Sequence, residues 1–327
     1  MRNGMKLLAA AAMALSFAGC SSQGESAQAP KVGVVQFAEH PALDNAYKGF
    51  VEGLKENGYD VEDGTVEIDY KNAQGDQSNN TTIAQTFVND NDDLIYAIAT
   101  PAAQATANAT KDIPIVISAV TDPKTSGLVK ENEKPETNVT GTSDLTPVDA
   151  QLDLLKQLVP DAKKIAIMYC NAEDNSKFQA DLAEAKAKEL GLDVEIATVT
   201  DSNQIQQVAE SLIGKVDAVY VPTDNLLAEG MATLAQVMSE NSIPLIVGEE
   251  GMVENGGLAT YGIDYFELGK LAGKQAAEIL KGEKQPEDMA IEYLPSEKRT
   301  LSINKTTADK IGIEIPEDLE GEATLVE

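Results

Sequence analysis

The sequence predicts an α/β protein built as two doubly wound parallel-sheet lobes, joined by a hinge of several crossings. Three observations lead to this prediction. The chain has 327 residues, enough for about two domains of ~150 residues each. Apolar residues make up 43% of it, as in proteins with a packed core. Short apolar runs alternate with amphipathic stretches in two successive series, which is typical of parallel sheets covered by helices on both faces.

The first series starts with residues 32–37, a short β-branched run that we expect to form a buried strand. Apolar residues then recur at helical spacing over 43–57, and Gly58 gives that helix a C-terminal stop. The series continues with expected strands at 65–70, 94–99 and 113–118 and expected helices at 78–89 and 100–111.

The second series repeats the alternation after a gap. Its expected strands are 165–169, 194–199, 218–221 and 244–247, and its expected helices are 176–190, 205–213 and 226–240.

Several crossings are expected to connect the lobes, because a single crossing would leave roughly the last 60 residues without a sheet to pack against. Residues 138–142 have little helical character and are interpreted as the first crossing, and 256–264 as a strand leading back. We expect lobe 1 to hold 31–140 and about 264–294, and lobe 2 to hold 141–263 and about 295–327. Short crossings of this kind can act as a hinge. The alternative is two independent domains on a simple linker.

The N-terminus has the pattern of a secretion signal over residues 1–19. Arg2 and Lys6 form a basic start, and the apolar run at 7–17 is shorter than the ~20 residues of a membrane span. The run ends in Phe17-Ala18-Gly19-Cys20, which resembles the lipobox of bacterial lipoproteins. This resemblance implies cleavage before Cys20, a diacylglycerol on its thiol and a protein held at the outer face of the cytoplasmic membrane by lipid alone. The polar stretch that follows, to residue 30, would be a flexible tether. The alternative is an ordinary cleaved signal with an incidental cysteine.

Charge and composition exclude several classes of function. The chain has 25 Lys and Arg against 54 Asp and Glu, a net charge of −29, which disfavours binding to nucleic acid. With one histidine and two cysteines, a Cys/His metal site is not expected, and lipidation of Cys20 would leave Cys170 without a disulfide partner. No nucleophile elbow, dinucleotide turn or P-loop is found, so we expect neither an enzyme nor a bound cofactor. A carboxylate-only hydrolase remains an alternative.

Ligands of parallel α/β sheets bind beyond the carboxyl ends of the strands. That rule selects loops in both lobes: 36–45, 100–104, 118–123, 170–176, 222–226 and 248–252. Their equivalent positions in the two series suggest a shared cleft.

Two of these loops suggest complementary halves of a site for a zwitterion. Thr100 is a good N-cap before Pro101, and free amides at Ala102 and Ala103 would suit a carboxylate. In lobe 2, Asp224 at a strand end could take an ammonium group. The alternatives are that Thr100 only caps its helix, and that Asp224 or Asn225 only caps the next one. Other acids considered for the ammonium are Asp122, Glu173, Asp174, Glu249 and Asp264.

Aromatic residues at strand ends and crossings could wall a side-chain pocket or belong to the core: Phe37, Tyr169, Tyr261 and Tyr265. His40 in the first loop could contact a ligand, although a lone loop histidine is more often exposed or capping.

Several segments, in order along the mature chain, resemble the extracytoplasmic solute-binding proteins of ABC transporters, and most closely the family that includes tryptophan- and other aromatic amino acid-binding lipoproteins. The segments are Gly33-Val34-Val35-Gln36-Phe37, His40-Pro41-Ala42-Leu43-Asp44, residues 99–104, Thr121-Asp122-Pro123, Asn138-Val139-Thr140-Gly141, Glu173-Asp174-Asn175-Ser176, Val221-Pro222-Thr223-Asp224-Asn225 and Gly257-Leu258-Ala259.

The resemblance implies a type I periplasmic-binding-protein fold with three crossings and a small solute, such as an aromatic amino acid, closed between the lobes. The implied pocket residues are Gln36, Phe37, Thr100, Ala102, Ala103, Ser118, Asn175, Asp224 and Asn225. The implied partners are an ABC permease and its ATPase, with the binding protein itself expected to be a monomer. The alternatives are a sensor subunit that presents its solute to a membrane receptor, and a nucleoside or sugar as ligand.

Overall fold

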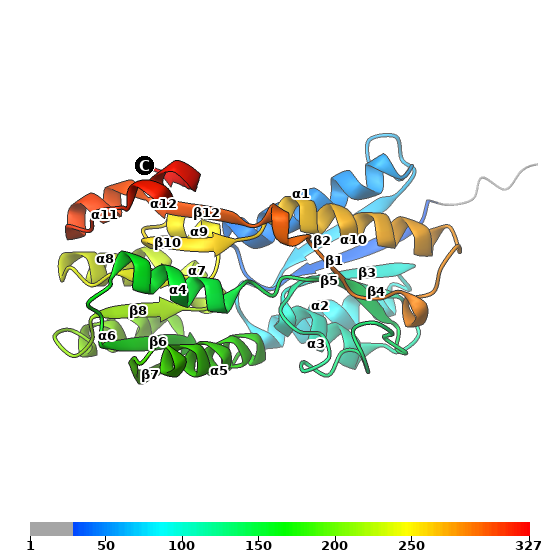
Figure 1. The fold of residues 1–327 in the computed structure, drawn as a ribbon. Helices are drawn as coiled ribbons and strands as arrows, with labels where there is room; N and C mark the ends of the chain where they lie inside the picture. The colour runs from blue at the N-terminus through cyan, green and yellow to red at the C-terminus, as the bar shows by residue number, and fades with distance from the viewer. Residues whose placement is uncertain (1–28) are drawn as a thin grey trace, which may run out of the picture.

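The computed structural model describes residues 29–327 (Figure 1). The expected signal peptide, Cys20 and most of the expected tether lie outside the described residues. In the part that is described, no helix is long and apolar enough to cross a membrane.

Two separate sheets organise the chain. The first has the order β11-β5-β4-β3-β1-β2, and every pairing in it is parallel. Its strands are β1 (Lys31–Gln36), β2 (Glu67–Asn72), β3 (Leu94–Ile98), β4 (Ile115–Val120), β5 (Val139–Ser143) and β11 (Glu292–Tyr293). The second sheet has the order β13-β12-β10-β9-β8-β6-β7, with β10 and β12 antiparallel and the other pairs parallel. Its strands are β6 (Lys164–Cys170), β7 (Asp193–Val199), β8 (Ala218–Val221), β9 (Leu245–Val247), β10 (Ala259–Gly262), β12 (Thr300–Asn304) and β13 (Thr324–Val326).

Helices cover both faces of each sheet, because the central strands are apolar on both sides. The helices of the first lobe are α1 (Pro41–Glu56), α2 (Gln77–Asn89), α3 (Thr100–Ala109) and α10 (Tyr265–Leu280). Those of the second are α4 (Val148–Leu158), α5 (Asp174–Glu189), α6 (Ile205–Ser211), α7 (Asn225–Glu229), α8 (Met231–Glu240), α9 (Glu250–Glu254), α11 (Lys305–Ile311) and α12 (Glu317–Glu322). Short 3-10 turns are η1 (Ser202–Gln204), η2 (Pro286–Asp288) and η3 (Ser296–Lys298). The second lobe has two apolar clusters, one under α4 and α5 and the other under α6 and α8.

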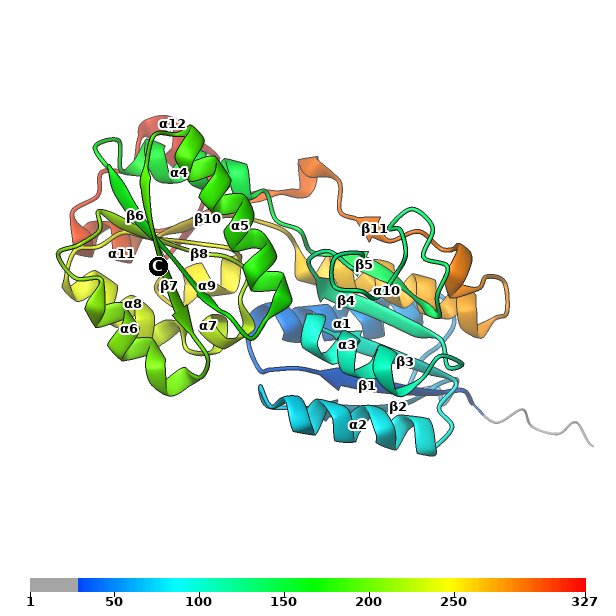
Figure 2. The ribbon, with the colours of Figure 1, turned by 90° about the horizontal axis from the view of Figure 1, so that it is seen from below.

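The chain passes between the lobes three times (Figure 2). It leaves the first sheet after β5, returns from β10 to α10, and leaves again between β11 and β12. The residues expected to form the first crossing instead form β5, which pairs with β4. Strand β5 was not predicted because it contains Gly141, a residue type with low strand propensity. Glycine is required at this position because a Cβ there would lie 2.2 Å from the carbonyl oxygen of Ile117 in β4.

Other elements also differ from expectation. Helices α4, α9, α11 and α12 and strand β13 were not predicted. The single helix expected over 226–240 is two helices that meet at Gly230.

Helices α1 and α10 form the closest helix pair of the first lobe. Their backbones touch through small residues, since a Cβ on Gly49 would lie 1.9 Å from the carbonyl oxygen of Phe266. A Cβ on Gly269 would lie 2.1 Å from that of Ala46. Because both helices begin at the side of the lobe that faces the second sheet (Figure 1), this pair fixes the positions of their first residues there.

Candidate functional site

A cavity lies where the two lobes meet, at the carboxyl ends of strands from both sheets. This is the position that the rule for parallel α/β sheets predicts. Its walls are His40, Leu43, Ala119, Thr121, Asp144, Asn175, Thr223, Asp224, Asn225, Ala228, Glu249 and Tyr265.

The lobes are closed over this cavity. Direct hydrogen bonds cross between them: Gln104 Nε2 donates to Asp174 Oδ2 over 2.9 Å, and Gln179 Nε2 donates to Thr121 Oγ1 over 3.1 Å. The space open to the centre of a water molecule is only about 20 Å³, enough for about one water. A larger solute can therefore enter only when the lobes separate.

Four buried side-chain atoms in the cavity walls have no hydrogen-bond partner, and all four are acceptors. Three are the oxygens Asp144 Oδ1, Asn175 Oδ1 and Glu249 Oε1. The fourth is Nδ1 of His40, whose Nε2 lies 3.4 Å from Asn225 Oδ1. Because that oxygen can only accept, Nε2 carries the proton of the neutral ring and Nδ1 is left as an acceptor. Buried polar atoms are rarely left unpaired, so the cavity is complementary to a group with several donors.

The electrostatics of the cavity also favour a cation. Burial raises the pKa of Asp144 to about 6 and that of Glu249 to about 7. Burial lowers the pKa of His40 to about 4, so its ring is neutral at physiological pH. No lysine or arginine is among the residues that line the cavity. Within residues 29–327, no group of three or more His, Cys, Asp or Glu side chains could hold a metal ion.

Two further carboxylates at this site already have backbone partners. Asp224 accepts the amide of Leu227 over 2.8 Å at the start of α7 and the amide of Cys170 over 2.6 Å. Glu173 accepts the amide of Leu226 over 3.0 Å. Burial raises the pKa of both carboxyls, and in Glu173 the charge of Asp224 raises it further. Their bonds fix the loops that carry Asn175 and Asn225.

Two residues near the carboxyl ends of strands in the first sheet have strained backbone conformations. Ala99 after β3 has φ +82°, and Ala119 near the end of β4 has φ +55°. Such conformations are costly for residues with a Cβ, and they persist where the surrounding structure imposes them, often at binding sites.

The comparisons with known proteins agree with a two-lobed binding protein. Residues 31–327 match the family model described as ABC transporter substrate binding protein. This chain belongs to that family. It is 45% identical over 295 residues to the tyrosine-binding protein of Clostridioides difficile (strain R20291), covering 88% of this chain and 85% of that protein. The relatives are substrate-binding proteins, not enzymes.

Two solved structures are similar to this substrate-binding protein over 91% of its chain. One is an ABC domain from Streptococcus pneumonia in complex with L-Trp, 41% identical, matched over 100% of its own chain with a TM-score of 0.87. The other is the ligand-free, open structure of a substrate-binding protein with adhesive properties from Clostridium difficile, 44% identical, matched over 99% with a TM-score of 0.69. The predicted fold of two α/β lobes with parallel sheets is confirmed.

The structure brings three of the nine expected pocket residues of this substrate-binding protein into the cavity wall: Asn175, Asp224 and Asn225. The other six lie at the end of β1 (Gln36 and Phe37), in the first turn of α3 (Thr100, Ala102 and Ala103) and within β4 (Ser118). Phe37, Ala102 and Ala103 belong to the core of the first lobe. Ser118 Oγ is bonded to Thr142 Oγ1 over 2.8 Å.

The two remaining residues keep an unpartnered oxygen each. Gln36 donates to Ala38 O and to Asp44 Oδ1, both over 2.7 Å, while its Oε1 has no partner. Thr100 Oγ1, fully buried, has none either. The local expectation for α3 needs correction: the N-cap is Ala99 rather than Thr100, and the amide of Ala103 is not free, since it donates to Ala99 O over 3.0 Å.

Several wall residues were not expected from sequence, above all Asp144. It follows β5, so it would have been found by the strand-end rule if 139–143 had been interpreted as a strand. The sequence offers Glu249 only as an alternative partner for the ammonium group, and Tyr265 only as an aromatic residue of the pocket or the core. The structure places both in the cavity wall.

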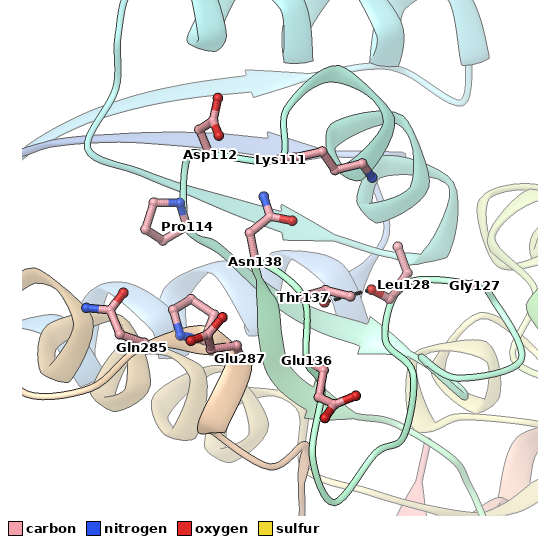
Figure 3. Close-up of a pocket in the computed structure, with 11 residues that line it drawn as sticks. Lys111, Asp112, Pro114, Gly127, Leu128, Glu136, Thr137, Asn138, Gln285 and Glu287 are labelled. Carbon is pink, nitrogen blue, oxygen red and sulfur yellow. Dashed lines mark hydrogen bonds between the residues drawn. The ribbon is translucent and has the colours of Figure 1, made fainter.

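A larger pocket of about 510 Å³ lies at the opposite end of the first sheet (Figure 3). Two of its polar side chains are already bonded to backbone: Asn138 donates to Ile113 O over 2.8 Å and Thr137 to Leu128 O over 3.0 Å. None of its lining residues has an unpartnered buried side-chain atom. It lacks the chemical complementarity found between the lobes.

Proposed function

We propose that this substrate-binding protein closes around a free amino acid with an aromatic side chain, such as tyrosine or tryptophan, and delivers it to an ABC permease. The observation that carries the proposal is the set of four unpartnered acceptors in the cavity wall: His40 Nδ1, Asp144 Oδ1, Asn175 Oδ1 and Glu249 Oε1. An ammonium group has three donors and a positive charge, so it can pair with three of these four acceptors and offset the buried negative charge of this wall.

The carboxylate of the ligand would be held by the first lobe. Helix α3 begins directly after β3, which pairs with β4, the strand that carries the wall residue Ala119. It has no side-chain cap, and Thr100 Oγ1 at its first position is buried without a partner. Free amides at a helix start attract an anion.

Two comparisons support the choice of ligand and state. The relative from Clostridioides difficile is named for tyrosine, and the similar structure from Streptococcus pneumonia holds L-Trp. The chain superposes better on that complex (TM-score 0.87) than on the ligand-free, open structure (0.69), as a closed arrangement of the lobes would.

The mechanism follows from contacts made to both lobes at once. A solute whose ammonium contacts His40 of the first lobe together with Asn175 and Glu249 of the second stabilises the closed state over the open one. The closed form would dock on the permease, and ATP hydrolysis by the transporter would reopen it. Lipid on Cys20 would keep the protein at the outer face of the cytoplasmic membrane.

Calorimetric titration with matched ligands tests the proposal. We expect L-tyrosine or L-tryptophan to bind, and 3-(4-hydroxyphenyl)propionate, which lacks only the amino group of tyrosine, to bind about 100-fold more weakly because the acceptors stay unpaired. Equal affinity for tyrosine and this analogue would contradict the ammonium site. Binding of sugars or nucleosides in place of amino acids would contradict the ligand class.

A further inference from the structure

Gln179 on α5 joins three segments of the closed protein through one fully buried side chain. Its Nε2 donates to Thr121 Oγ1 over 3.1 Å and also to Thr223 Oγ1. Its Oε1 lies 3.3 Å from Thr146 Oγ1, which donates to it from the crossing between β5 and α4. Both amide protons and the carbonyl oxygen therefore have partners.

The partners of Gln179 belong to different lobes. Thr121 directly follows β4 of the first sheet, and Thr223 follows β8 of the second. Both threonines line the cavity, whereas Gln179 does not. Its side chain thus lies behind the wall and ties together two wall residues that face the ligand from opposite lobes.

We propose that Gln179 is a positioning residue for solute retention: its side chain bridges Thr121 and Thr223 only when the lobes are closed, and thereby slows dissociation of the bound solute. The proposal rests on the proposed function, in which a solute is held in the closed cleft.

Of the two hydrogen bonds that the Gln179 amide donates, only the one to Thr121 spans the lobes, so it is present in the closed form and absent in the open one. When the lobes part, Thr121 moves away with the first sheet, while Gln179 and Thr223 stay together in the second. Ser143 Oγ donates to Thr121 O over 2.7 Å, so Thr121 is itself held to the end of β5 and cannot follow Gln179. Opening must therefore break a buried hydrogen bond.

Loss of the hydrogen bond between Gln179 and Thr121 should change the dissociation rate constant of the solute but not its association rate constant. A solute first meets the open protein, in which the bond between Gln179 and Thr121 is absent, so the association rate should not depend on it. Dissociation requires reopening, so loss of the bond should raise the dissociation rate about 5-fold.

The test compares Gln179→Met with a matched control, using stopped-flow binding of L-tyrosine. Methionine keeps the length of the side chain and removes its hydrogen bonds. The control is Gln275→Met: Gln275 on α10 is 1% exposed, and its amide donates to Glu292 Oε1 over 2.9 Å inside the first lobe. We expect the dissociation rate to rise about 5-fold in Gln179→Met, with the association rate within about 2-fold, and neither rate to change in Gln275→Met.

A second variant checks that the bond to the first lobe is responsible. In Thr121→Val the acceptor is lost, and adding Gln179→Met should then raise the dissociation rate by less than about 2-fold more. An unchanged dissociation rate in Gln179→Met, an equal rise in Gln275→Met, or full additivity with Thr121→Val would each overturn the assignment while leaving the proposed function standing. Failure of the unaltered protein to bind any amino acid would overturn both.

Discussion

Asp144 shows how one side chain can combine structural and ligand-binding demands. One carboxylate oxygen accepts the hydroxyl of Tyr265 over 2.9 Å, and the other is buried in the cavity without a partner. Burial without a cation raises the pKa of this carboxyl to about 6. An unpaired buried carboxylate destabilises the empty protein, and a ligand ammonium removes that cost when it binds.

Replacement of Asp144 by asparagine should therefore separate binding from stability. We expect Asp144→Asn to bind L-tyrosine about 10- to 100-fold more weakly, because a charged acceptor is lost, and to melt at the same temperature as the unaltered protein or higher. Titration calorimetry and thermal unfolding without ligand measure the two effects. A variant that binds normally would remove Asp144 from the ammonium site.

Asp224 offers the contrasting case. Because both of its oxygens accept backbone amides, from Leu227 and Cys170, Asp224→Ala should lower the unfolding free energy by about 1–2 kcal/mol. The role first considered for Asp224, contact with the ammonium, is better suited to carboxylates that keep a free oxygen. Normal stability with abolished binding would restore that first role.

At the scale of elements, the α1–α10 pair depends on glycine at the contact. A methyl group on Gly269 would lie 2.1 Å from Ala46 O and 2.9 Å from the amide nitrogen of Phe50, and backbone atoms cannot move aside as a flexible side chain can. The helices would have to separate, which would shift their first turns, including His40 before α1 and Tyr265 in α10.

We therefore expect Gly269→Ala to destabilise the protein by about 2–3 kcal/mol, since overpacking outweighs the roughly 1 kcal/mol gained from helix propensity. Chemical denaturation measures the change. Gly321→Ala is the matched control, because Gly321 lies in α12 and, apart from its chain neighbours and the backbone of its own helix, no atom lies within 4 Å of the added methyl. That variant should be neutral or slightly more stable, and equal effects in both variants would refute the role of close packing.

The elements also show what sequence can predict. Apolar strands such as β3 and β4 were predicted because a strand buried on both faces leaves a continuous apolar run. Strand β5 was not predicted, because Val139–Ser143 is mostly polar and contains a glycine, which weakens the sequence pattern of a strand. That glycine is required by close contact with Ile117. That single omission hid Asp144, while Asn175 and Asn225 were found because their strands were. The partners of Gln179 depend on closure of two lobes, which no local pattern encodes.

At the scale of the whole molecule, closure buries a strongly acidic site in a protein that is itself acidic, with a net charge of −29. In the folded chain without ligand, the raised pKa values of Asp144 and Glu249 mean that the native state binds more protons than the unfolded state as pH rises from about 4 to about 7. These two groups then contribute a loss of stability over that range. His40 acts in the opposite sense, because its pKa is lowered and its contribution to stability is lost as pH falls below about 6.5 towards about 4.

Ligand binding should therefore be coupled to proton release. Burial raises the pKa of Asp144 to about 6 and that of Glu249 to about 7, and a bound ammonium would favour their ionised forms. His40 stays neutral above about pH 5, and burial keeps Tyr265 protonated by raising its pKa well above 10. Glu173 and Asp224 also have raised pKa values, but their backbone partners remain when the ligand binds.

We expect affinity for L-tyrosine to fall as pH is lowered from about 8 to about 5, where the carboxyls of Asp144 and Glu249 both carry protons. At about pH 6.5, calorimetry in two buffers that differ in ionisation enthalpy should show net proton release, and Asp144→Asn should release fewer protons. Affinity independent of pH over this range, or net proton uptake, would contradict an ammonium site built on these carboxyls.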